Sequence, residues 1–123
     1  MTKFKSQGFS NTFKNARKGF RLVLRSEMNI RIHITIAFFV LLFAYLLDFS
    51  ALEYCALLFA IAIVIVTEML NTAIEFTLDA IFHNKYSRMV GMAKDISAGA
   101  VMFASFISVV VGLLLFSKHF FNV

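Results

Sequence analysis

Three long apolar stretches, separated by short polar ones, dominate the pattern of the sequence. The chain carries no charged residue over residues 34–47, 54–67 and 96–117. A helix needs about 20 residues to cross the hydrocarbon of a bilayer, so the first two stretches must take in polar residues at their ends. The pattern therefore predicts three transmembrane helices, at about residues 30–49, 54–82 and 93–117.

The segment before the first apolar stretch has a different pattern. Its apolar side chains recur at helical spacing, at Phe9, Phe13, Ala16, Phe20, Val23 and Leu24. Its basic side chains fall on other faces, at Lys14, Arg17, Lys18, Arg21 and Arg25. A basic amphipathic helix of this kind lies in the plane of the membrane surface. We therefore expect a surface helix over residues 8–27, and a plain membrane anchor is the simpler alternative role for it.

Composition supports an integral membrane protein. Hydrophobic residues make up 60% of the 123 residues and charged residues only 15%, and the mean hydropathy is +0.82. Proline is absent and glycine is scarce, which leaves little turn chemistry for an all-β fold. The sequence thus predicts an all-α integral membrane protein with a single domain over residues 1–123.

The net charge of +5 is better explained by a membrane than by nucleic acid. Positive residues gather before the first span and in the loop over residues 83–88, whereas the connection over residues 48–53 carries two acids and no Lys or Arg. Cytoplasmic loops of membrane proteins are the ones enriched in Lys and Arg. We therefore expect the N-terminus and the loop over 83–88 in the cytoplasm, the C-terminus outside, and no nucleic-acid partner.

A polar stripe follows the second apolar stretch. Glu68, Asn71, Glu75 and Asp79 are spaced by three, four and four positions, so they share one face of a helix. Glu68 is expected at membrane depth near the inner boundary, and Glu75 about 10 Å further along the helix axis, near water. Ionisable side chains at membrane depth are costly and mark functional sites.

The predicted topology brings further polar residues to the same boundary. Glu27 ends the surface helix, and Lys94 and Asp95 begin the third span. Carboxylates bind Mg²⁺, a lysine neutralises phosphate oxygens, and a carboxylate at membrane depth can take a proton from a lipid hydroxyl. Together with the polar stripe, this set of side chains suits phosphoryl transfer.

Other functions are compatible with parts of this pattern. Glu75 and Asp79 would simply end their helix by pairing with a nearby cation, which is Lys85, Arg88 or Lys94. A small oligomeric channel would also place carboxylates inside a bundle, but a permeation path needs polar residues throughout the membrane, and the other two spans have almost none. A membrane scaffold would have no need of Glu68.

A few positions have structural interpretations. His33 has no second histidine or cysteine at ligand spacing, so we expect an interfacial or hydrogen-bonded side chain and not a metal ligand. Cys55 is expected to be a small buried side chain. The third span has small residues at every fourth position, which let helices approach closely in lipid, at Ala100, Ala104, Ser108 and Gly112.

Two separated motifs resemble the bacterial membrane diacylglycerol kinase and undecaprenol kinase family. One is the run Glu68-Met-Leu-Asn-Thr-Ala-Ile-Glu75, and the other is Ala93-Lys94-Asp95 at the start of the third span. The resemblance covers residues 8–117. It implies a homotrimer of three-span subunits with a surface helix, in which neighbouring subunits share the active sites.

The resemblance also implies roles for single residues. The family transfers the γ-phosphate of MgATP to a lipid alcohol, so Glu68 would be the general base on the lipid hydroxyl, and Glu27 and Glu75 would hold Mg²⁺. Three further side chains would contact or orient the nucleotide: Asn71, Lys94 and Asp95. Asp79 would be structural, anchoring the helix end. The basic residue that touches ATP would be Lys5, Lys14 or Arg17.

The substrate implied by the resemblance is a polyprenol. Asn29-Ile30-Arg31-Ile32-His33 and Ser97-Ala98-Gly99-Ala100-Val101 resemble the undecaprenol kinase branch. The diacylglycerol branch tends to have a glutamine and an acid at the positions of Ile32 and His33. We therefore expect phosphorylation of undecaprenol in the inner membrane, with diacylglycerol as the alternative substrate.

Overall fold

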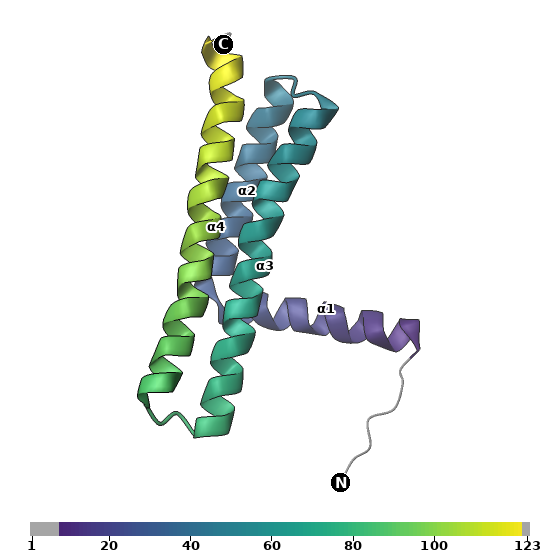
Figure 1. Cartoon of the computed structure of the whole chain (residues 1–123). Helices are drawn as coiled ribbons and strands as arrows, with labels where there is room; N and C mark the ends of the chain where they lie inside the picture. Colours follow the sequence, from purple (N-terminus) through teal and green to yellow (C-terminus); the bar gives the residue numbers. More distant parts are fainter. Residues whose placement is uncertain (1–7, 122–123) are drawn as a thin grey trace.

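The computed structural model describes residues 8–121, which form four helices and no strand. These are α1 (Phe9–Ser26), α2 (Met28–Leu46), α3 (Ala51–Phe82) and α4 (Arg88–Phe121). In Figure 1, α2, α3 and α4 stand side by side as a bundle, and α1 leaves the bundle sideways. Helices α2, α3 and α4 are each long and apolar enough to cross a membrane. The predicted all-helical architecture with three long apolar helices is thus confirmed.

The helix bounds differ from the predicted spans for two physical reasons. Helix α2 ends at Leu46 and not near residue 49, because the backbone turns at Asp48, which adopts a left-handed φ of 56°. Helix α4 begins at Arg88, before residue 93, because hydropathy detects only the part of a helix that is apolar. Helices α3 and α4 have 32 and 34 residues. At 1.5 Å per residue both are roughly 50 Å long and extend beyond a hydrocarbon layer of about 30 Å.

The short connection between α2 and α3 is fixed by a capping box. The Ser50 hydroxyl accepts from the backbone N–H of Glu53 at 3.2 Å, and the Glu53 carboxylate accepts from the backbone N–H of Ser50 at 3.1 Å. The same carboxylate pairs with Nε2 of His119 at 2.7 Å, and the imidazole ring stacks on Phe49. The end of α4 is thereby tied to the start of α3.

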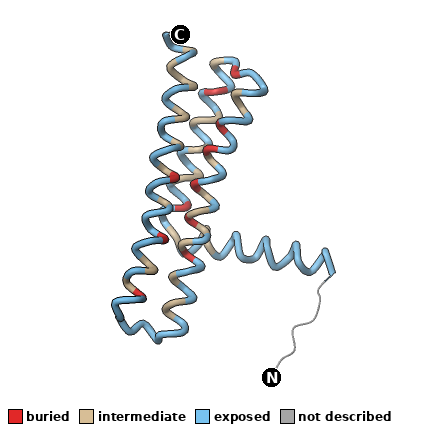
Figure 2. Tube along the Cα trace, in the orientation of Figure 1, coloured by how far each residue is buried: buried red, intermediate tan, exposed pale blue. Residues whose placement is uncertain are grey.

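Few side chains are buried, because three helices alone enclose little volume. Figure 2 shows the buried positions along the lines where α2, α3 and α4 meet, and exposed residues over the outer faces. One cluster of buried side chains lies near the connection, at Ala44, Phe49 and Leu57. Cys55 was expected to be buried, but it is exposed. It lies on an outer face of α3, where an apolar side chain suits lipid as well as a core.

The small-residue row of α4 lets α3 and α4 approach closely. Ala104 is buried, and the Ser108 hydroxyl donates to the backbone carbonyl of Ala60 on α3 at 2.7 Å. Such a contact between a side chain and the facing backbone requires small residues at the interface. The close helix packing predicted from the row is present at these two positions, whereas Ala100 is exposed.

Helix α1 has no buried residue. Its phenylalanines are exposed, with Phe9 86% exposed and Phe13 60% exposed, and no part of the bundle covers them. At the corner between α1 and α2, Glu27 has an extended backbone and belongs to neither helix. The Arg31 guanidinium donates across this corner to the backbone carbonyls of α1, at Leu24 (3.4 Å) and Arg25 (3.2 Å). Arg31 of α2 therefore links α2 to α1 across the corner that carries Glu27.

Candidate active site

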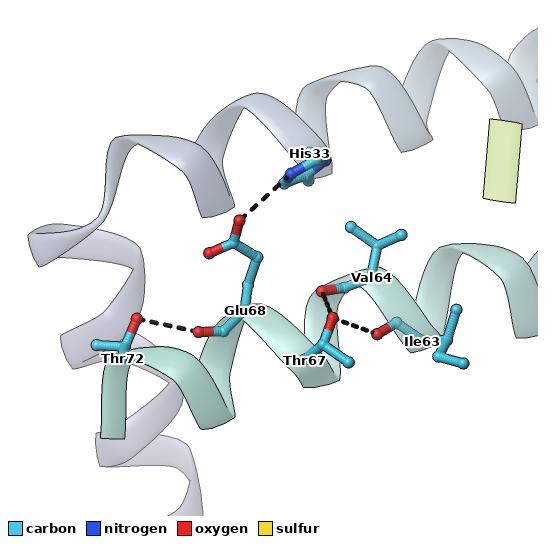
Figure 3. A network of polar contacts seen from close by, with 6 residues as sticks. All are labelled: His33, Ile63, Val64, Thr67, Glu68 and Thr72. Atoms are coloured by element: carbon cyan, nitrogen blue, oxygen red, sulfur yellow. Dashed lines mark hydrogen bonds and ion pairs between the residues drawn. The ribbon is translucent and has the colours of Figure 1, made fainter. Parts of the chain in front are cut away.

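Glu68 is a buried carboxylate, only 4% exposed, on the face of α3 that meets α2. Its position follows from the sequence pattern, because Leu57, Ala60 and Val64 are buried on the same face at helical spacing. Thr72, one turn further along, donates to the backbone carbonyl of Glu68 at 3.0 Å. The carboxylate faces His33 of α2, with Nε2 at 3.6 Å from Oε1 (Figure 3).

Two further carboxylates lie on the side of Glu68 away from the connection between α2 and α3. Glu75 is half-buried on α3, two turns beyond Glu68, and Glu27 is half-buried at the corner between α1 and α2. When ionised, both carry the same negative charge as Glu68. Since like charges repel, such a group of carboxylates suits a site whose ligand brings positive charge.

Asn71 is held by α4. The Ser97 hydroxyl, which is buried, lies 2.6 Å from Oδ1 of Asn71 and donates to it. The same hydroxyl is 3.1 Å from the backbone carbonyl of Lys94. With Oδ1 engaged by Ser97, the amide NH₂ of Asn71 is the group left to act as a donor to a ligand.

Lys94 and Asp79 form an ion pair between α4 and α3, with Nζ at 2.7 Å from Oδ1. Asp79 therefore has the structural role expected from the sequence. The sequence also allowed Glu75 and Asp79 each to pair with a cation. Asp79 does so, whereas no ion pair of Glu75 occurs among residues 8–121. Asp95 is exposed and lies outside this network. The structure thus links Asn71 and Lys94 to the α3–α4 interface, whereas Asp95 is exposed.

The donor set fits a magnesium ion that is shared with a nucleotide. Over residues 8–121 no group of three or more His, Cys, Asp or Glu side chains is arranged to hold a metal by itself. Mg²⁺ is commonly held by one or two carboxylates together with substrate phosphates, and not by an all-protein cage. Glu27 and Glu75 supply hard oxygen ligands of that number, so the chemistry of these residues agrees with such an ion.

Two contacts of the site were not predicted from the sequence. His33 was expected to be interfacial or hydrogen-bonded, and the structure identifies Glu68 as its partner. Ser97 was noted only within a motif, and the structure makes it the residue that orients Asn71. Helical spacing gives the faces of one helix, but it does not give the rotation of α2 and α4 relative to α3. Of the basic residues considered for ATP, Lys14 and Arg17 are exposed on α1, and Lys5 lies outside the described residues.

Comparison with known protein families decides the class of the protein. Residues 14–116 match the family described as prokaryotic diacylglycerol kinase. The chain belongs to the prokaryotic diacylglycerol kinase family. The matched stretch includes all the candidate site residues, from Glu27 to Asp95. Membership makes the protein an enzyme of the lipid kinase class, so a channel or scaffold role is not supported.

Individual members of the prokaryotic diacylglycerol kinase family match over most of the chain. The undecaprenol kinase of Bacillus subtilis is 36% identical over 108 residues, which are 88% of this chain and 87% of the relative. The diacylglycerol kinase of Escherichia coli K12 is 30% identical over 116 residues, 92% of this chain and 94% of the relative. The diacylglycerol kinase of Synechocystis is 33% identical over 101 residues, which cover 82% of this chain and 58% of that longer relative.

Proposed function

We propose that the protein transfers the γ-phosphate of MgATP to undecaprenol, giving undecaprenyl phosphate and ADP. The observation that carries the proposal is the position of Glu68, a buried carboxylate with an apolar groove on one side and the carboxylates of Glu27 and Glu75 on the other. Lipid and nucleotide would thus approach the same carboxylate from opposite sides. The 36% identity to a protein named undecaprenol kinase supports the choice of lipid.

The groove between α2, α3 and α4 suits the apolar chain of a lipid. Its volume is about 440 Å³, and it reaches from His33 at one end to Phe116 at the other. Apart from His33 and two serines, Ser105 and Ser108, its lining is apolar. Because the lipid chain comes from hydrocarbon and not from water, van der Waals packing in the groove would hold it there.

Glu68 would act as the general base. In the proposed step the lipid hydroxyl oxygen attacks the γ-phosphorus, its proton passes to the Glu68 carboxylate, and the bond between the γ-phosphorus and the bridging oxygen of ADP breaks. Burial keeps water away from the carboxylate, which disfavours hydrolysis of ATP in place of transfer.

The nucleotide would lie against the cytoplasmic ends of α3 and α4. Mg²⁺, when bound, supplies positive charge for the phosphate oxygens, and Glu27 and Glu75 are the side chains that would hold it. An ammonium group has three N–H donors, so Lys94 can keep its ion pair with Asp79 and still donate to a phosphate oxygen. Asn71 would donate through its NH₂ group. Asp95, which is exposed, would reach the nucleotide at its open side.

The proposed enzyme is a homotrimer in the inner membrane. The N-terminus, α1 and the loop over residues 83–87 would face the cytoplasm, because the positive charges lie there, and the C-terminus would face outward. The apolar side of α1 would lie on the membrane surface. A site shared between subunits would let a neighbouring chain cover the open side where Asp95 lies.

The choice between the two lipids has a direct test. Undecaprenol and diacylglycerol would be supplied in equal amounts in mixed micelles, with labelled ATP and Mg²⁺, to the purified protein. We expect undecaprenol to be phosphorylated at least roughly tenfold faster, a preference that needs only about 1.4 kcal/mol of differential transition-state binding. A preference for diacylglycerol would retain the lipid kinase function and refute the proposed substrate, and labelling of neither lipid would refute the kinase function itself.

Replacing Ser97 by Ala tests the proposed role of Asn71. The loss of one hydrogen bond at 2.6 Å frees the amide to rotate, and we expect KM for ATP to rise roughly threefold to tenfold, the equivalent of one neutral hydrogen bond. Ser117→Ala is the matched control, because that hydroxyl bonds only its own helix, at the carbonyl of Leu113. An unchanged KM for ATP in Ser97→Ala would mean that Asn71 does not contact the nucleotide.

A further inference from the structure

Within residues 8–121, the basic side chain at ion-pair distance from the carboxylate of Glu68 is that of His33. Glu68 is 4% exposed, so water contributes little. Nε2 of His33 lies 3.6 Å from Oε1 of Glu68. Figure 3 shows the imidazole ring of α2 directed across the interface at the carboxylate of α3. A buried carboxylate with no partner takes up a proton, and a protonated carboxyl group is no base.

Two other cations near this end of the bundle, Arg31 and Lys94, bond other groups. Arg31, two positions before His33, donates to backbone carbonyls of α1. Lys94 is held by an acid of α3 at 2.7 Å. The carboxylates of Glu27 and Glu75 act on Glu68 with the same sign of charge. His33 is thus the side chain that faces the Glu68 carboxylate from α2.

His33 also links the carboxylate to the groove. The imidazole lines the end of the apolar groove that is nearest to Glu68. The other polar residues that line the groove, Ser105 and Ser108 of α4, are uncharged. A lipid whose apolar chain lies in the groove would thus bring its hydroxyl group to the Glu68–His33 pair.

We propose that His33 is a positioning residue for Glu68: its imidazole ring, with Nε2 at 3.6 Å from Oε1, faces the carboxylate at the end of the groove where the lipid hydroxyl arrives. The inference rests on the proposed function, in which Glu68 accepts the hydroxyl proton. The two side chains project from adjoining helices joined by a short capped connection, which fixes their relative position. The ring acts through Glu68, and the proton of the lipid goes to the carboxylate.

The test compares His33→Leu with His33→Gln in the full-length chain, assayed with ATP, Mg²⁺ and undecaprenol. Leucine removes the donor, whereas the glutamine amide keeps an N–H of similar reach. We expect His33→Leu to lower kcat roughly tenfold to thirtyfold, because the buried carboxylate loses the side chain that pairs with it, and to leave KM for ATP within about twofold. His33→Gln should recover most of kcat, which a purely structural role of the ring would not allow.

The matched control is His119→Gln. His119 forms the same kind of pair, with Nε2 at 2.7 Å from Oε2 of Glu53, at the opposite end of the bundle. This control should keep the wild-type kcat. Thermal unfolding of each variant checks the fold, and His33→Phe replaces the leucine variant if the latter does not fold.

Two outcomes overturn the inference while wild-type activity stands: a wild-type kcat in His33→Leu, or equal loss in His33→Leu and His33→Gln. A wild-type protein that phosphorylates neither undecaprenol nor diacylglycerol gives a separate result. It overturns the proposed function and this inference with it.

Discussion

Replacing Glu68 by Gln should lower kcat for phosphate transfer to undecaprenol roughly a hundredfold to ten-thousandfold, the usual contribution of a general base. The substitution keeps the shape and the burial of the side chain and removes its ability to accept a proton. Because the carboxylate is buried and the nucleotide is expected to bind closer to the cytoplasm, KM for ATP should change little. Steady-state kinetics with labelled ATP measure both quantities.

The control for Glu68→Gln is Glu53→Gln, the same substitution on the same helix. Glu53 caps the start of α3 and pairs with His119, so its replacement should lower the thermal stability and leave kcat of the folded protein unchanged. If Glu68→Gln keeps wild-type kcat, another group accepts the proton and the role proposed for the buried carboxylate is wrong. If both variants lose activity and unfold together, the loss reflects stability and not catalysis.

Much of the fold was predictable because the bilayer imposes a length on apolar helices. Three uncharged stretches predicted three helices, and all three are present. The helix ends were less predictable, because they depend on local backbone chemistry. The pattern Ser-x-x-Glu at Ser50 and Glu53 is a capping-box signal that the sequence did contain, and it would have placed the start of α3 at Ala51.

The candidate site was predictable as a face of one helix but not as a set of contacts. Spacing alone put Glu68 and Glu75 on one stripe of α3. The partners His33 and Ser97 come from α2 and α4, and the rotation of these helices follows from packing, including the contact of Ser108 with the backbone of α3. The ion pair of Lys94 with Asp79 shows the same limit, since spacing left Lys85, Arg88 and Lys94 as equal candidates.

Removing both Glu27 and Glu75 should have the second large effect, on the requirement for Mg²⁺. The two carboxylates come from different elements, the corner before α2 and the part of α3 beyond Glu68. If they hold one ion together with ATP phosphates, each Gln variant should raise the Mg²⁺ concentration for half-maximal activity by roughly tenfold, because affinity at oxygen sites follows the number of charged ligands. Titration of Mg²⁺ at saturating ATP measures this concentration.

The double variant separates a shared ion from two independent effects. Ligands of one ion act as a unit, so Glu27→Gln with Glu75→Gln should depart from the product of the single effects, whereas independent surface charges would multiply. Asp48→Asn is the control, because it removes one negative charge at the opposite end of the bundle and should leave the Mg²⁺ requirement unchanged. A variant at the corner between α1 and α2 gives a further check. Arg31→Ala removes the donor that joins α2 to the α1 carbonyls and should reproduce part of the Glu27→Gln effect without changing any carboxylate. Wild-type Mg²⁺ dependence in both Glu27→Gln and Glu75→Gln would exclude these side chains as ligands, and the ion would then be held by the nucleotide and other groups.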